Sequence, residues 1–445
     1  MKYSFIILLY IIIFIESKES FFLDENLPKK GKTNAIIHFI NCGQADSILI
    51  EQNGRFGLID ASNPYAEATD VVESAGKRAE KNPDRSAQAV VNYLNHLKVE
   101  HLDFILSTHA HSDHIGGMPQ IAYHFVDKNT NFIYKEYRPN RENNQALFDA
   151  AYNSMKTKGA KLIDVTDEKY EFDFGDLHFE LINTNVHKKE EKSGENQNSI
   201  GAIVTYKNKR LFLAADLEIN DDLIYKDYIG KIDFLKMSHH GNGDSSFEFL
   251  NTTRPNYTVI TNWRFPSYAI IPTAFLQQKA GGKIFYVGGI ATSTEDVANS
   301  AIRLYLAEDL LDTSEDTRYY LYFENSGDNY DIGDDINGFQ KYQYYTFYFE
   351  KGKIITGLKK IDNKYYYFKE EGVMATGWQI IEKDGVNNMY YFDDNGEMLT
   401  GLQTLEGENG ECQYYFESDG HMVKNKCITV NEKELCFDKI GCYTK

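Results

Sequence analysis

The chain has 445 residues, enough for two or three domains, and its 42% hydrophobic and 14% aromatic content is ordinary for a folded protein. The formal net charge of −19 argues against general binding of DNA or RNA, which relies on Lys and Arg to neutralise phosphates. A phosphate-containing substrate is compatible with this charge, because bound cations can supply positive charge locally.

The N-terminal stretch MKYSFIILLYIIIFIESKES predicts a signal peptide over residues 1–20. One Lys precedes an apolar run from Phe5 to Ile15, and small and polar residues follow. The run is short for a membrane span, although an uncleaved anchor is the alternative. We therefore expect a secreted or cell-surface protein with no transmembrane segment beyond the signal peptide.

Residues 33–325 alternate strand-like and helix-like segments. AIIHFI and DSILIEQNGRFGLID predict strands joined by a hairpin at Asn53-Gly54. DRSAQAVVNYLNHLK has apolar residues at helical spacing with Asp84 as its expected cap, and HLDFILST predicts a short buried strand. Further strands are expected in FGDLHFELIN, SIGAIVTYKNKRLFLAAD, IDFLKMSHH, NYTVITN and KIFYVG. The pattern predicts an α/β or α+β sandwich of sheets covered by helices.

Four side chains that can bind metal follow the short strand, within LSTHAHSDHIGG. His109 and His111 alternate in an extended segment and can point the same way. Asp113 and His114, in the turn that follows, can reach a second position nearby. Imidazole and carboxylate together suit zinc or a similar divalent ion.

This hexapeptide resembles the HxHxDH signature of the metallo-β-lactamase superfamily, and the resemblance covers about residues 33–325. GLIDAS precedes it and ends a strand in Asp60; RLFLAAD follows with Asp216, which could alternatively cap the helix LEINDDLIY. DFLKMSHHGN then offers His239 or His240 as the last histidine ligand, and we favour His240. The resemblance implies an αββα sandwich.

The resemblance also implies two divalent metal ions, zinc in the first place with manganese or iron as alternatives. His109 and His111 would bind one ion, and Asp216 would bridge to the second. Asp60 would orient a ligand from outside the metal shell. The remaining ligands expected for the second ion are Asp113, His114 and His240, and the expected catalytic residues are Asp113, Asp216 and His239.

Many superfamily members carry another histidine before the bridging aspartate. The corresponding stretch here, SGENQNSIGAIV, offers Asn198, and His187 is a nearby alternative. One ion would then have one protein ligand fewer and an open position. TNWRFPSY supplies aromatic side chains after a strand expected near the metals, so the expected substrate-binding residues are His239, Asn198, Trp263 and Tyr268, with core packing as the alternative role of Trp263.

Residues 340–445 repeat an aromatic strand, a turn with Gly and a second short strand that ends in Thr-Gly. The anchors are Phe349, Phe368, Phe392, Phe416 and a degenerate copy at Phe437. One hairpin cannot bury its aromatic face alone, so we expect the copies to stack as a solenoid.

The repeats resemble the cell-wall-binding repeats of choline-binding and glucan-binding proteins. In choline-binding versions, aromatic residues of neighbouring copies hold a quaternary ammonium group by cation–π attraction. Only one copy here has Trp after the Thr-Gly pair, so choline, a glucan-like carbohydrate and a purely structural role all stay open. The candidate ligand-binding residues are Tyr367, Trp378, Tyr391 and Tyr415.

Four of the five cysteines cluster at the C-terminus: Cys412, Cys427, Cys436 and Cys442. In a secreted chain such a cluster favours two disulfides over a zinc site, and three pairings can be drawn.

NCGQADSILI and the LK..HHG strand resemble competence-type extracellular domains and the teichoic acid phosphorylcholine esterases, which join such a domain to choline-binding repeats. The resemblance implies a phosphodiesterase acting on phosphocholine-bearing surface glycans. Two alternatives are another hydrolase of the same fold, such as a nuclease or a lactone or ester hydrolase, and a carbohydrate- or choline-binding protein with an inactive metal domain.

Overall fold

The structure is a computed structural model that describes residues 31–65, 82–136, 142–166, 169–184, 194–292, 294, 296–309, 319–324, 336–383, 385–407 and 410–444. The signal peptide expected at residues 1–20 and the alternative ligand His187 lie outside the described residues. The described chain forms two compact units, one drawn from residues below 271 and 280–330 and the other from 271–279 and 331–445.

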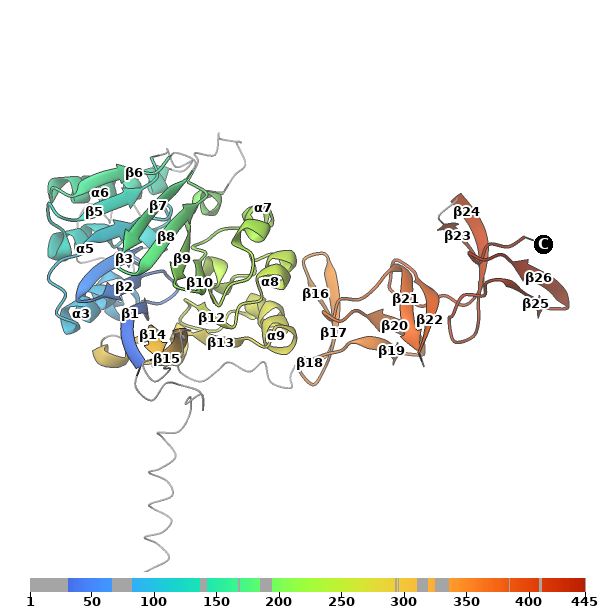
Figure 1. The fold of residues 1–445 in the computed structure, drawn as a ribbon. Helices are drawn as coiled ribbons and strands as arrows, with labels where there is room; N and C mark the ends of the chain where they lie inside the picture. The colour runs from blue at the N-terminus through green and yellow to red at the C-terminus, as the bar shows by residue number, and fades with distance from the viewer. Residues whose placement is uncertain are drawn as a thin grey trace, which may run out of the picture. The chain divides into compact units, whose positions relative to one another are not determined.

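The first unit contains an eight-stranded mixed sheet (Figure 1). Its strand order is β15-β14-β1-β2-β3-β4-β5-β6. The strands are β1 (Gly31–Ile40), β2 (Ile48–Gln52), β3 (Arg55–Ile59), β4 (Phe104–Leu106), β5 (Asn131–Tyr134), β6 (Lys161–Asp164), β14 (Ala301–Asp309) and β15 (Tyr319–Glu324). From β3 to β6 the neighbours pair in parallel, so their carboxyl ends share one edge of the sheet.

A seven-stranded sheet faces the first, in the order β13-β12-β11-β10-β9-β8-β7. Its strands are β7 (Tyr170–Phe174), β8 (Leu177–Ile182), β9 (Gly201–Tyr206), β10 (Lys209–Leu213), β11 (Phe234–Lys236), β12 (Tyr257–Ile260) and β13 (Lys283–Tyr286). Here β10 to β13 are parallel, so the segments after β10, β11 and β12 also emerge at one edge.

Two apolar layers hold this unit together. Side chains of both sheets, among them Phe39, Phe104, Phe179 and Phe234, form a buried layer between the sheets. Helices α3 (Ala87–His96), α5 (Met118–Phe125) and α6 (Glu142–Thr157) pack on the outer face of the first sheet. Over the second sheet, Phe249 of α8 (Phe247–Thr253) contacts Phe212 of β10. The remaining helices of this unit are α4 (Ser112–Ile115) and α7 (Ile219–Ile229), whereas α9 (Ile270–Lys279) groups with the second unit. The expected α/β class, with two sheets covered by helices, is confirmed.

The expected helix cap Asp84 was wrong, and so was the alternative role of Asp216 as a cap. Asp84 lies in a 3-10 turn (Pro83–Arg85), and Ser86 caps α3 because its Oγ accepts from Gln88 N at 3.3 Å. Helix α7 is capped by Glu218 rather than Asp216, which leaves the Asp216 carboxylate for other contacts. Serine is as good a cap as aspartate, and a short turn decided between them. Among the residues that the structure describes, no helix is both long and apolar enough to cross a membrane.

The second unit is a succession of β-hairpins. Strands β16 (Gly338–Tyr342), β17 (Tyr345–Glu350) and β18 (Lys353–Ile354) form a small sheet. The hairpins that follow are β19 (Gly357–Ile361) with β20 (Lys364–Phe368), β21 (Gly377–Lys383) with β22 (Val386–Phe392), β23 (Gly401–Gly407) with β24 (Gly410–Phe416), and β25 (Lys426–Val430) with β26 (Lys433–Phe437).

The pairing inside each copy differs from the expectation. The long hairpin joins the segment after Thr-Gly to the next aromatic strand, whereas the expected second short strand is mostly reduced to single bridges such as Phe368 to Met374 and Phe392 to Met398. Backbone bonds then link one copy to an earlier one, as from Met398 N to Tyr365 O at 2.8 Å. The stacking expected of the repeats therefore rests on these bonds and on the buried phenylalanines.

The four C-terminal cysteines form two disulfides, Cys412 with Cys442 and Cys427 with Cys436. The second joins residues that face each other in the β25–β26 hairpin, and the first ties strand β24 to the end of the described chain. Cys42 is free and buried in the first unit.

Candidate metal centre

The hexapeptide lies at the carboxyl edge of the first sheet. After β4, His111 is still extended (φ −85°, ψ 153°), and α4 begins at the next residue. The change from strand to helix turns Asp113 and His114 back toward His109, whose ring centroid is 4.1 Å from that of His114. His109 and His114 are almost completely buried, whereas His111 and Asp113 are partly exposed.

The six residues expected to bind metal come together as two groups. His109, His111 and Asp216 form one, and Asp113, His114 and His240 form the other, with one nitrogen or oxygen atom of each residue within 4.8 Å of the others in its group. Asp216 also groups with His240 and Asp46.

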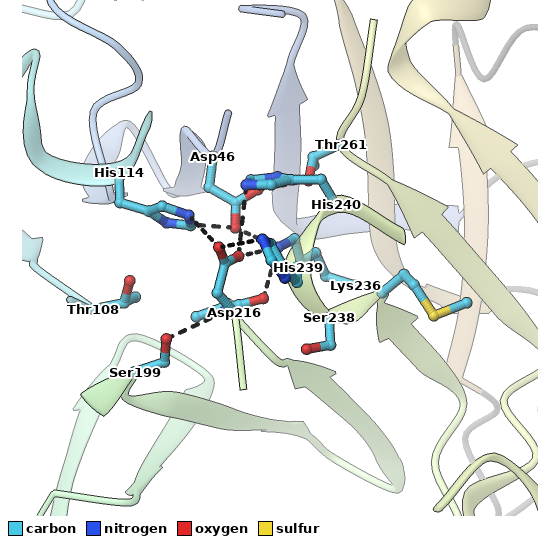
Figure 2. A network of polar contacts seen from close by, with 12 residues as sticks. Asp46, Thr108, His114, Ser199, Asp216, Lys236, Ser238, His239, His240 and Thr261 are labelled. Atoms are coloured by element: carbon cyan, nitrogen blue, oxygen red, sulfur yellow. Dashed lines mark hydrogen bonds and ion pairs between the residues drawn. The ribbon is translucent and has the colours of Figure 1, made fainter. Parts of the chain in front are cut away.

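Asp216 follows β10 and connects the two groups. Its Oδ2 lies 3.1 Å from His114 Nε2 and 3.8 Å from His109 Nε2, and its Oδ1 lies 3.6 Å from His240 Nε2. Figure 2 shows the carboxylate pointing toward the side chains of His114, His239 and His240. Burial raises the pKa of Asp216, but the charges of His114 and His240 outweigh it and hold this pKa well below its usual value.

The two adjacent histidines differ in environment. Both have left-handed backbone conformations, with φ 46° at His239 and 53° at His240. The His240 side chain is fully buried, with Nε2 3.5 Å from Asp113 Oδ2. By contrast, the His239 side chain is 27% exposed, its Nε2 lies 3.8 Å from Asp216 Oδ2, and its Nδ1 contacts Asp244. Strain of this kind concentrates at functional sites.

Asp60 holds His114 from outside the cluster. Its Oδ2 is 2.7 Å from His114 Nδ1 and accepts from Thr108 Oγ1 at 2.7 Å, which directs His114 Nε2 toward Asp216. Burial lowers the pKa of His114, but the carboxylates of Asp216 and Asp60 raise it well above its usual value. These two carboxylates therefore favour the protonated form of this imidazole in the metal-free state.

Our sequence reasoning missed three residues that support the cluster. Asp46 forms an ion pair with Lys236 Nζ at 2.5 Å, accepts from Thr261 Oγ1 at 2.6 Å, and lies 3.3 Å from His240 Nδ1 (Figure 2). Lys236 also donates to Ala215 O at 2.9 Å, next to Asp216. Asp46 stands in the NCGQADSILI stretch and Lys236 in DFLKMSHHGN, so buried charges inside otherwise apolar segments were the available signal.

Asn198 does not reach His239. Its Nδ2 donates to Glu195 Oε2 at 3.5 Å, and Asn196 instead places its Nδ2 3.3 Å from His239 Nδ1. Glu195 accepts from the backbone of Ala110 at 3.0 Å, between the first two histidines. The 3-10 turn at Glu195–Asn198 decides which of these side chains face inward, and no hydrophobic pattern in this polar segment indicates it.

The aromatic loop after β12 begins at the cluster. Thr261 Oγ1 is 3.1 Å from His240 Nδ1, and Asn262 Nδ2 donates to His240 O at 3.4 Å. Trp263 follows at 39% exposure, and Tyr268 is 70% exposed. Phe265 instead packs edge-on against Tyr286.

The candidate ligand residues of the repeats line up across the hairpins. Trp378 pairs with Tyr391, whereas Leu358 and Leu402 occupy the same position opposite Tyr367 and Tyr415. The Trp378 ring lies 5.0 Å from that of Tyr391 and also contacts Tyr414 and Phe416. Aromatic rings of neighbouring copies meet at all three positions, since Tyr367 also contacts Phe392 and Tyr415 contacts Phe437, but only Trp378 contributes an indole ring.

The donor set fits divalent metal ions. Imidazoles and carboxylates are buried together, and four atoms there make no hydrogen bond to any residue that the structure describes: His114 Nε2, His240 Nε2 and both carboxylate oxygens of Asp216. Buried polar atoms without partners are costly, and a bound cation would satisfy all four.

Comparison with known proteins agrees with this division of the chain. Residues 82–238 match the family described as beta-lactamase superfamily domain, and residues 355–401 match the family described as choline-binding repeat. The first match includes His109, His114 and Asp216 of the cluster, and the second lies within the β-hairpins of the second unit.

Two curated relatives match the first part. Recombination protein 2 of Haemophilus influenzae is 25% identical over 241 residues, covering 52% of this chain and 25% of the relative. A metal-dependent hydrolase of Enterococcus faecalis is 26% identical over 194 residues, covering 42% of this chain and 80% of the relative. The chain thus spans about a quarter of the length of the first relative.

Solved structures resemble shorter parts of the chain. Choline-binding protein F of Streptococcus pneumoniae is 26% identical, with a TM-score of 0.22, and the match covers 30% of this chain and 50% of that one. The autolysin LytC of the same organism is 26% identical, with a TM-score of 0.20 and 24% coverage of both chains. These scores carry no argument beyond the similarity itself.

Proposed function

We propose that the chain is a secreted binuclear metal hydrolase that cleaves phosphodiester bonds, with phosphorylcholine esterase-like activity on phosphocholine-bearing cell-wall or surface glycans. The observation that carries this proposal is the union, in one chain, of the buried cluster around Asp216 with choline-binding repeats. A catalytic domain over residues 33–325 and repeats over 340–445 would bring the hydrolase to the polymer that it cuts.

The proposed ligand sets follow the two groups. His109 and His111 would hold one divalent ion, Asp113, His114 and His240 the other, and Asp216 would bridge them. Burial and the contact with Asp113 support His240 over His239 as the ligand. When bound, two such ions activate water and offset charge on a phosphate group.

The protein groups then have separate tasks. Asp60 orients His114, and Thr261 and Asp46 orient His240, through the ring nitrogens that face away from the cluster. His239 stands at the exposed side with Asp244 against its Nδ1, which raises its pKa despite burial. Its Nε2 can therefore carry a proton to the leaving oxygen of the substrate.

Turnover assays on three substrates distinguish the hydrolase classes. Full-length protein loaded with zinc or manganese, with metal content measured, would be assayed on p-nitrophenyl phosphocholine, bis-p-nitrophenyl phosphate and a lactone. We expect turnover of the phosphocholine diester, abolished by Asp216→Ala. Asp227→Ala, at a side chain that is 80% exposed on α7, serves as the control and should keep full activity. Absence of phosphocholine turnover, or activity that survives Asp216→Ala, would reject the proposal.

The repeats are tested separately by retention on immobilised choline. Trp378→Leu gives its copy the residue found at positions 358 and 402. We expect this variant to elute at lower free choline, because the cation–π contact is lost. Unchanged retention would assign the repeats a different ligand or a structural role.

A further inference from the structure

Two guanidinium groups gather over one indole ring beside the candidate metal centre. Arg85 Cζ lies 4.2 Å from the ring centroid of Trp263, and Arg264 Cζ lies 5.1 Å from the same centroid. Arg85 belongs to the 3-10 turn before α3, so segments far apart in the sequence meet here. Contact with the ring restricts both side chains, and a guanidinium group that packs on a ring can still donate hydrogen bonds from its N–H edge. Arg264 is exposed and Arg85 is half-buried.

The two charges are not balanced by described carboxylates. Neither Arg85 nor Arg264 makes an ion pair with an acidic side chain in the part of the chain that the structure describes. Arg55 is a useful contrast, since it lies 4.8 Å from the Phe174 centroid but also donates to Asp103 at 2.9 Å. In a chain of net charge −19, two guanidinium groups within 5.1 Å of one ring centroid form a local positive region that favours an anion.

The pair of arginines lies next to the cluster. Trp263 directly follows Asn262, whose side chain bonds the backbone of His240. On the other side, a Cβ placed on Gly43 would lie 3.0 Å from Arg85 Cβ, and the loop from Gly43 leads to Asp46. Each arginine is therefore connected through a short segment to a residue that contacts His240.

We propose that Arg85 and Arg264, held on Trp263, form an oxyanion subsite that binds a phosphate group of the substrate other than the one being cleaved. This assignment to substrate rests on the proposed function, in which the substrate is a phosphate-bearing polymer. Guanidinium groups bind phosphate oxygens in pairs, and stacked ones do so at lower entropic cost. A trimethylammonium group would meet two like charges at this ring, so Trp263 recognises the anionic part of the substrate and not its choline.

The chain has two tryptophans, so Trp378→Phe leaves Trp263 as the sole fluorescent indole. Full-length protein with this substitution, stripped of metal by a chelator, would be titrated with inorganic phosphate, choline chloride and sodium chloride at matched ionic strength. We expect a saturable change in Trp263 emission with phosphate alone. Adding Arg85→Gln and Arg264→Gln should weaken phosphate binding at least about tenfold, whereas Arg55→Gln should leave it unchanged.

Three results would overturn the subsite: no saturable response to phosphate, a saturable response to choline, or phosphate binding that survives both Gln substitutions. If the doubly substituted protein fails to fold, as judged by circular dichroism, the phosphate and choline titrations of the Trp378→Phe protein still decide. Because no turnover is measured, failure of this experiment leaves the hydrolase proposal standing. Conversely, absence of phosphocholine turnover would leave the anion site intact.

Discussion

Lys236 tests whether its buried ion pair with Asp46 stabilises the candidate metal centre. It ends β11 and is fully buried. Its ammonium group forms an ion pair with Asp46 Oδ2 at 2.5 Å and donates to Ala215 O at 2.9 Å, and it lies 3.9 Å from Asp216 Oδ1. Lys236→Met keeps most of the volume but removes the charge, the ion pair and the hydrogen bond, which leaves the Asp46 carboxylate without its ammonium partner.

Removing one partner of a buried pair costs about 3–5 kcal/mol, because the other charge stays buried and uncompensated. We expect the free energy of unfolding of the first unit to fall by about this amount in metal-free protein. Lys209→Met is the matched control on the neighbouring strand. Its ammonium is 3.5 Å from Asp233 Oδ1 and its side chain is 23% exposed, so loss of this pair should cost about 0–1 kcal/mol.

Urea unfolding would be followed by Trp263 emission in the Trp378→Phe background, so that only the first unit reports. Asp46→Asn and the double variant complete a mutant cycle, and we expect the double variant to lose less than the sum of the single losses by about 0.5–3 kcal/mol. If Lys236→Met costs no more than Lys209→Met, or if the two losses simply add, the buried pair does not stabilise this site and the reasoning fails.

Three further outcomes follow from the structure. Asp216→Ala should bind at least one metal ion fewer per chain than the unsubstituted protein, measured by elemental analysis after dialysis against zinc; equal content would contradict the bridging role. Burial lowers the pKa of His240, but Asp216 and Asp46 raise it to about 9 in the metal-free state, and the pKa of His114 is also raised. Protons and metal compete for these nitrogens, so zinc affinity should rise from pH 6 to about pH 9 as the protons leave, and binding at pH 7 should release protons. Calorimetry in two buffers of different ionisation enthalpy measures that release, and identical heats would refute it. Finally, Cys412→Ala with Cys442→Ala opens a 30-residue link and should destabilise the last repeats by about 3.5 kcal/mol, against about 2.5 kcal/mol for the 9-residue link of Cys427 with Cys436. Thermal unfolding that ranks the two variants in the opposite order would contradict the loop-entropy argument.

Local pattern was enough for most of the first unit. The hairpin at Asn53-Gly54 forms between β2 and β3, and each segment with alternating or continuous apolar residues became a strand. These features depend on neighbours a few residues apart, which the sequence displays directly. The cap of α3 was harder to predict, because Ser86 and Asp84 lie within one turn and either could cap the helix. The strand pairing inside the repeats was also harder to predict, because each repeat can be divided into hairpins at two points.

The candidate site shows the same difference between features set by neighbouring residues and features set by long-range contacts. Local sequence was sufficient to predict that the candidate ligands His109 to His114 cluster, because they share one strand-to-helix turn, and that the aromatic repeats follow one another, because their period is local. Three findings required the folded chain: Asp46, Lys236 and Thr261 meet next to His240, Arg85 lies over Trp263, and the cysteines pair as they do. The contacts of the first unit join residues separated by up to 215 positions, and they depend on how its two sheets pack face to face, which no local pattern of residues records. The cysteine pairs depend instead on the β-hairpins of the second unit.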